Sequence, residues 1–169
     1  SDSVPSAPIS IAVALADKLE TLIGIYGIGL IPTGDKDPFA LRRHALGVLR
    51  IILDNQLNIN LRALLRLSKA AFNDIKLMDG VEDKVFEFML ERLRHYLHGS
   101  FSVQQVEAVL SAQPDYLHDI PAKLAAIASF AHLPEAEPLA AANKRISNIL
   151  KKADYIPTIV EESLLQAPA

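Results

Sequence analysis

Cysteine and tryptophan are absent from the 169-residue sequence, and aromatic residues make up only 6% of it. Without cysteine the chain can form no disulfide framework, no thiolate metal site and no thiol nucleophile. This absence fits a reducing compartment, and we expect a cytoplasmic protein. Long apolar runs are also missing, because Asp17, Lys18 and Glu20 interrupt them, which argues against a membrane-spanning helix. We find no basic segment followed by an apolar stretch and a cleavage site, as a secretory leader would require.

The net charge is −3, so the chain as a whole does not attract nucleic acid, and any RNA contact must come from a local basic patch. Half of the residues are hydrophobic. Alanine and leucine dominate that half, which favours packed helices over sheets. The length suits one medium domain or two very small ones.

The spacing of apolar residues predicts an all-α fold, an irregular bundle of about seven or eight helices with no sheet. Asn60 is a candidate N-cap, and Ser102 with Gln105 forms a capping-box pattern. We assign residues 1–8, rich in Ser and Pro, to a linker, residues 9–152 to a helical domain, and residues 153–169 to the start of a further linker. The predicted helices cover about residues 9–26, 39–53, 61–75, 82–98, 102–113, 119–133 and 138–152, and a short one begins near Thr158.

A glycine-rich stretch from Gly27 to Arg43 runs directly into a strongly signalled helix. Asp37 followed by Pro38 is typical of an N-cap and the first helical position. On the helix that follows, Arg43, Gly47 and Arg50 share one face.

Gly47 costs this helix about 1 kcal/mol relative to alanine. The missing side chain between the two arginines is therefore better explained by another group that approaches the helix backbone closely at this point. One interpretation is a basic strip that contacts a phosphate backbone or another polypeptide backbone. The other is an ordinary surface helix with arginines, whose glycine only touches a neighbouring helix.

A second basic surface is predicted on the helix over residues 138–152. Its apolar positions, which we expect to pack, are Ala142, Ile146, Ile149 and Leu150, and its cations are Lys144, Arg145, Lys151 and Lys152. The two lysines at the C-terminal end also interact favourably with the helix dipole, which is a purely structural reason for their presence.

Signals of catalytic chemistry are few. The glycine cluster has neither dinucleotide-loop nor P-loop spacing. His95 and His98 are three residues apart on one helix, but no carboxylate is visibly paired with them, and Asp119 after His118 is explained as a helix cap. Because we find no nucleophile and base at supportable spacing, no catalytic residue is assigned. Asp17 lies on a small and polar helix face, where we expect a confined setting and a partner.

Four segments of the sequence resemble the bacterial glycyl-tRNA synthetase beta subunit. They are residues 14–22, 27–43, 45–51 and 142–150, which together reach across about residues 9–152. The helices between the third and fourth segments match mainly in pattern. His44 departs from the family motif, which more often has a small residue there.

The resemblance implies a non-catalytic piece of a ligase, joining the end of an HD-type domain to the helices before a C-terminal anticodon-binding domain. The family's enzyme is a heterotetramer of alpha and beta subunits that uses ATP with magnesium to attach glycine to its tRNA. The aminoacylation site lies in alpha, and beta is associated with tRNA recognition. We therefore expect no cofactor for this piece alone, with glycine tRNA and the alpha subunit as partners and no membrane contact.

If this piece contacts tRNA, the candidate contacts to its phosphates are the cations of the two basic surfaces, Arg42, Arg43, Arg50, Lys144 and Arg145. Asp17 matches the place of the metal-binding aspartate of HD-type domains, but the histidine and His-Asp ligands would lie upstream, so no metal is assigned. The alternative is a structural connector that holds neighbouring domains or the partner subunit. In that case the arginines would be bridged to Asp35, Asp37 or other acidic residues.

Overall fold

The computed structural model describes residues 4–152, and the fold of these residues is all-α, as predicted, with helices joined by turns and loops. The described residues form no strand, and their β-type pairing is limited to two isolated bridges, Thr33 with Lys36 and Asn60 with Tyr116. The helices are α1 (Pro8–Gly27), α2 (Leu41–Asp54), α3 (Leu61–Ala70), α4 (Val81–Leu97), α5 (Val103–Leu110), α6 (Ile120–Phe130) and α7 (Ala136–Leu150). The helix start expected near Thr158 and the linker over 153–169 lie outside the described residues.

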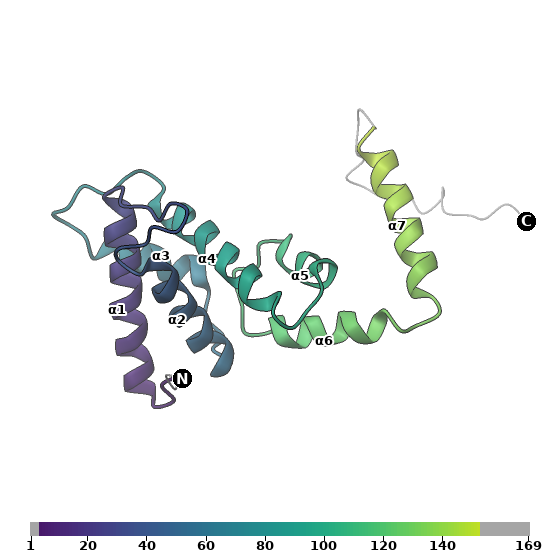
Figure 1. The fold of residues 1–169 in the computed structure, drawn as a ribbon, viewed down its shortest axis with the longest axis horizontal. Helices are drawn as coiled ribbons and strands as arrows, with labels where there is room; N and C mark the ends of the chain where they lie inside the picture. The colour runs from purple at the N-terminus through teal and green to yellow at the C-terminus, as the bar shows by residue number, and fades with distance from the viewer. Residues whose placement is uncertain (1–3, 153–169) are drawn as a thin grey trace, which may run out of the picture. The chain divides into compact units, whose positions relative to one another are not determined.

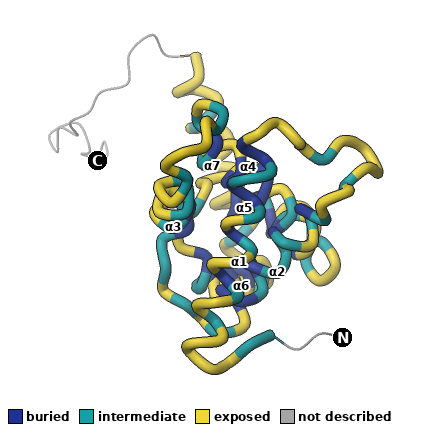
Figure 2. The backbone as a smooth tube through the Cα atoms, turned by 90° about the vertical axis from the view of Figure 1, so that its left-hand side faces the viewer, coloured by how far each residue is buried: buried dark blue, intermediate teal, exposed yellow. Residues whose placement is uncertain are grey.

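The chain divides into two compact units, Ser1–Ala128 and Ser129–Ala169, and each is described by itself. In the first unit α1 packs against α2, α3 and α4, while α4 also contacts α2, α3 and α5 (Figure 1). The core comes from the apolar faces of these helices, which are dark blue in Figure 2. Each fully buried Leu, Ile or Phe contributes about 1.5–3 kcal/mol. Fully buried examples are Leu22, Ile23, Leu49, Ile52, Phe86 and Met89.

Two predicted helix starts are confirmed in detail. The Asn60 side chain accepts a hydrogen bond from the Ala63 amide at 2.8 Å. The Ser102 hydroxyl accepts from the Gln105 amide at 3.3 Å, and the Gln105 side chain accepts from the Ser102 amide at 2.9 Å. Both caps work within one turn of helix, so the local sequence is sufficient to specify them.

The predicted start of α2 is wrong by two residues, although its capping residue is right. The helix begins at Leu41 rather than Phe39, and the residue before it, Ala40, has a left-handed backbone with φ 54°. Asp37 caps from a distance, because its two carboxylate oxygens accept the amides of Leu41 at 2.8 Å and Arg42 at 2.9 Å. Pro38 therefore lies in the turn before the helix.

The α3 helix is shorter than predicted, ending at Ala70 rather than near Ile75, which is exposed. Arg62 on α3 joins three parts of the first unit. Its guanidinium lies 2.7 Å from the Asp83 carboxylate on α4 and 3.0 Å from that of Asp115, after α5. It also stacks 3.7 Å above the centre of the Phe86 ring.

The expected packing of α7 is wrong within the described residues, since none of its residues is buried. Ile146 and Ile149 are 55% and 67% exposed, and Ala142 and Leu150 are also exposed. An apolar stripe at helical spacing specifies which face needs a partner, but it does not say that the partner lies in the same stretch of chain.

Candidate functional site

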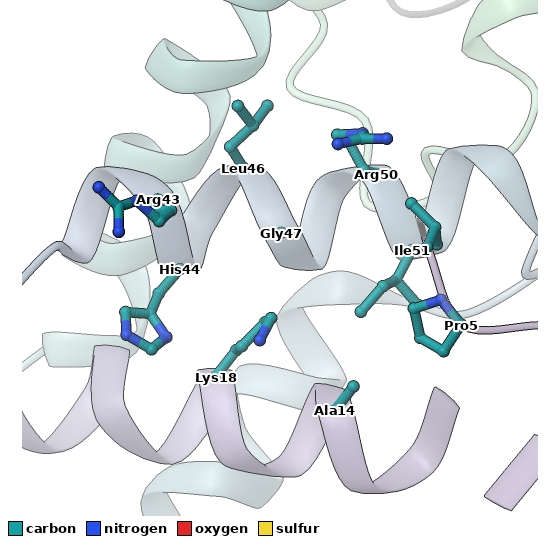
Figure 3. A pocket seen from close by; sticks show the side chains of 10 residues that line it. Pro5, Ala14, Lys18, Arg43, His44, Leu46, Gly47, Arg50 and Ile51 are labelled. Carbon is teal, nitrogen blue, oxygen red and sulfur yellow. The ribbon is translucent and has the colours of Figure 1, made fainter. Parts of the chain in front are cut away.

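A pocket of about 310 Å³ opens between α1 and α2 and gathers most of the basic side chains of these two helices. Figure 3 shows Ala14 and Lys18 reaching it from α1, while α2 supplies the residues on the other side. The pocket is lined by Val4, Pro5, Ala14, Lys18, Arg43, His44, Leu46, Gly47, Arg50 and Ile51.

The position of the basic face follows from the burial of the opposite face of α2. Val48, Leu49 and Ile52 are fully buried in the core, which fixes the rotation of the helix about its axis. Arg43, four residues before Gly47, and Arg50, three residues after it, then lie together along the open side. The predicted strip of Arg43, Gly47 and Arg50 therefore lines one pocket.

The gap at Gly47 is occupied by the side chain of Lys18 from α1. A Cβ atom placed on Gly47 would lie 2.9 Å from Lys18 Cε and 3.0 Å from Cδ, closer than ordinary contacts allow. Figure 3 shows the lysine rising from α1 towards this glycine. The glycine thus contacts the neighbouring helix, as the second interpretation expected, and the group that contacts it is a lysine side chain rather than a backbone. Through this contact Lys18 joins the two arginines at the pocket.

The cations of the pocket have weak acidic partners. Lys18 Nζ lies 3.9 Å from Asp17, and Arg50 Nε lies 3.8 Å from Asp54. Both carboxylates are exposed, and pairs of this kind contribute about 0–1 kcal/mol. Among the described residues Arg43 has no ion pair or hydrogen bond to another side chain. The pocket therefore keeps a positive charge that is available to an anion.

His44 adds a polar atom without a partner. Its Nδ1 is buried from solvent and makes no hydrogen bond among the described residues. An unsatisfied buried polar atom costs free energy, so the imidazole is suited to a ligand that supplies the missing bond. In Figure 3 the ring lies on the side of α2 that faces α1.

The other predicted contacts lie elsewhere. Arg42 does not line the pocket, since its guanidinium donates to the Gly34 carbonyl oxygen at 2.5 Å and so ties the glycine-rich loop to α2. Lys144 and Arg145 are exposed on α7, in the second unit.

The expected confined setting of Asp17 is wrong, because its side chain is 68% exposed. This side of α1 faces solvent, and the backbone carbonyl of Asp17 accepts a hydrogen bond from the Thr21 hydroxyl. No group of three or more His, Asp or Glu side chains suited to a metal gathers within residues 4–152. In the same part of the chain, no helix is long and apolar enough to cross a membrane.

Lys18 and His44 are the site residues that sequence reasoning missed. Lys18 is the only cation between Ile9 and Tyr26, and a single lysine in an apolar helix is a signal that could have marked it. A second cavity of about 590 Å³ runs between α1 and α3, but its lining is mostly Ala and Leu with Glu20 as its one charged residue. That groove lacks the charge needed for an anion.

Comparisons with known proteins agree with the resemblance described above. The family model described as glycyl-tRNA synthetase beta subunit matches residues 1–111. A protein named glycine–tRNA ligase beta subunit from Ralstonia nicotianae is 49% identical over 169 residues, covering 99% of this chain and 24% of the relative. Its namesake from Neisseria meningitidis serogroup B is 51% identical over 168 residues, covering 98% and 24%. The chain thus spans about a quarter of the length of these relatives.

Proposed function

The chain belongs to the glycyl-tRNA synthetase beta subunit family, and from this premise we propose that it is a non-catalytic segment of a glycine–tRNA ligase that contributes to tRNA recognition. In this proposal the ATP-dependent attachment of glycine takes place in the alpha subunit, which is the partner of beta. The present segment binds the phosphate backbone of the tRNA.

The observation that carries the proposal is the basic pocket between α1 and α2. Lys18, Arg43 and Arg50 all line this pocket, and the acidic partners of Lys18 and Arg50 are no nearer than 3.8 Å. The net charge of the chain is −3, so a concentration of positive charge on one face is a local feature rather than a result of composition. Such a face suits phosphates, which position an RNA without reading its sequence.

Arg42 is left out of the proposed RNA contacts and kept as a structural residue. Its guanidinium donates a hydrogen bond to the Gly34 carbonyl oxygen, which holds the glycine-rich loop on α2. The remaining candidates Lys144 and Arg145 stay in the proposal as a separate basic surface on α7.

The proposal is tested by titrating salt against the binding of this chain to glycine tRNA. Each lost phosphate contact lowers the slope of log affinity against log salt by about 0.7–0.9. We expect the double variant Arg43→Glu/Arg50→Glu to lower the slope by about 1.4–1.8 and to bind far more weakly, with an unchanged melting temperature.

The matched control is Arg66→Glu/Lys76→Glu, which makes the same change in charge at exposed residues away from the pocket. If the control loses as much affinity as the pocket variant, the binding is not located at the pocket. If the unmodified chain does not bind even at low salt, the connector function replaces the proposed one.

A further inference from the structure

We infer that Lys18, whose side chain lies against α2 at Gly47, is a third phosphate-binding cation. Together with His44 it forms a binding site for one phosphodiester of an RNA strand, which we call the phosphate seat. This inference rests on the proposed function and adds Lys18 and His44, which were not among the contacts predicted from the sequence. The ligand class is a phosphate that is part of a polynucleotide backbone, held between two helices rather than on one.

The arrangement along α2 shows why a third cation is useful. Arg43 and Arg50 are seven residues apart, so their backbones are separated by about 10 Å along the helix axis. Gly47 lies between them, about 6 Å beyond Arg43. Because Lys18 crosses the helix at Gly47, its ammonium supplies a positive charge in the interval where α2 itself has none.

The lysine is also held more firmly than a typical surface lysine. Its side chain is only 29% exposed, and its methylene groups lie against the backbone of α2 at Gly47. A long side chain loses up to about 2 kcal/mol of rotamer entropy when it is fixed, and part of this cost is already met in the folded chain. A phosphate bound here therefore needs to order less of the protein.

His44 supplies a hydrogen-bonding group beside the charges. It lies four residues after Ala40 and three before Gly47, so it is on the part of α2 that faces α1. Its buried Nδ1 has no partner among the described residues, and a neutral imidazole with its proton on this nitrogen can donate to a phosphate oxygen.

Three single variants and one double variant of this chain test the seat, with glycine tRNA as the probe. Lys18→Met keeps the length of the side chain and removes its charge, so we expect the salt slope to fall by about 0.7–0.9. Gly47→Ala displaces the lysine, and we expect it to weaken binding at constant salt while the melting temperature is unchanged or higher, since alanine favours the helix. His44→Phe, which keeps a ring of similar size, is expected to weaken binding without changing the slope.

The double variant Lys18→Met/Gly47→Ala separates a shared site from two independent effects. Because Gly47 acts through Lys18, the double variant should bind no more weakly than Lys18→Met alone. Lys76→Met is the control for loss of one exposed lysine and should bind as the unmodified chain does.

The outcomes distinguish this inference from the function on which it rests. If Lys18→Met leaves the slope unchanged while Arg43→Glu/Arg50→Glu abolishes binding, the seat is wrong and the proposed function stands. If Gly47→Ala and Lys18→Met add in full, the lysine does not act at the glycine and the seat is again wrong. If no form of the chain binds the tRNA, both proposals fail together.

Discussion

Replacing Asp37 with alanine should destabilise the first unit, because this carboxylate is the side chain that caps the start of α2. Its two oxygens accept the amides of Leu41 and Arg42 at 2.8 and 2.9 Å. Loss of a capping side chain costs about 0.5–2 kcal/mol of stability. A hydrogen bond to a charged acceptor such as this carboxylate contributes more to stability than one to a neutral acceptor. We therefore expect a loss of about 1–2 kcal/mol, to which the interaction of the carboxylate with the helix dipole also contributes.

The corresponding change in melting temperature follows from the size of the unit, Ser1–Ala128. With an unfolding entropy of about 2.1 cal/mol/K per residue, a loss of 1–2 kcal/mol lowers the melting temperature by about 4–7 °C. Thermal unfolding followed by far-UV circular dichroism measures this directly, and urea unfolding gives the free energy independently.

Two further variants make the measurement specific to the cap. Asp37→Asn retains one acceptor oxygen and should lose less stability than Asp37→Ala. Asp35→Ala removes an exposed carboxylate two residues earlier and should change the melting temperature by less than about 1 °C. Equal effects of Asp35→Ala and Asp37→Ala would show that the carboxylate contributes only general charge, and the capping argument would be refuted.

Two other predictions concern ion pairs between helices. Arg62→Met removes contacts to two carboxylates and to an aromatic ring, so we expect urea denaturation to show a free energy of unfolding lower by about 1–3 kcal/mol. Arg66→Met, at an exposed position one turn later, should lower the free energy of unfolding by less than about 0.5 kcal/mol. Equal decreases for the two variants would contradict the role of Arg62. The hydrogen bond from Lys69 holds the pKa of Glu82 below its ordinary 4.5, so this pair stabilises the fold above pH 4.5 and the contribution is lost as the pH falls through the lowered pKa. Glu82→Gln should flatten the pH dependence of unfolding in that acidic range, and an unchanged profile would show that the pair is not responsible.

The features that the sequence predicted correctly depend on neighbours within a few positions. The Asn60 cap and the capping box at Ser102 each join residues three apart, so the local chain determines them. Asp37 was identified as a cap by its type, but the extra turn through Ala40 was not predicted, because a left-handed alanine has no signal in the sequence.

The features that could not be predicted depend on how helices pack. Lys18 becomes part of the site only because α1 packs on α2 in the register that brings it to Gly47. A lone lysine in one helix and a lone glycine in another do not specify that register. For α7, the spacing of Ile146 and Ile149 marks an apolar face, but the described part of the chain buries neither residue.

Arg62 also bears on the order in which the first unit folds. Its partners Asp83 and Asp115 are 21 and 53 residues away along the chain. Closing a loop of the longer length costs roughly (3/2)RT ln n, about 3.5 kcal/mol, before any contact is gained. The arginine can thus bind both carboxylates only after α3 and α4 have come together. We therefore expect these contacts to form late in folding, so that Arg62→Met should speed unfolding more than it slows folding.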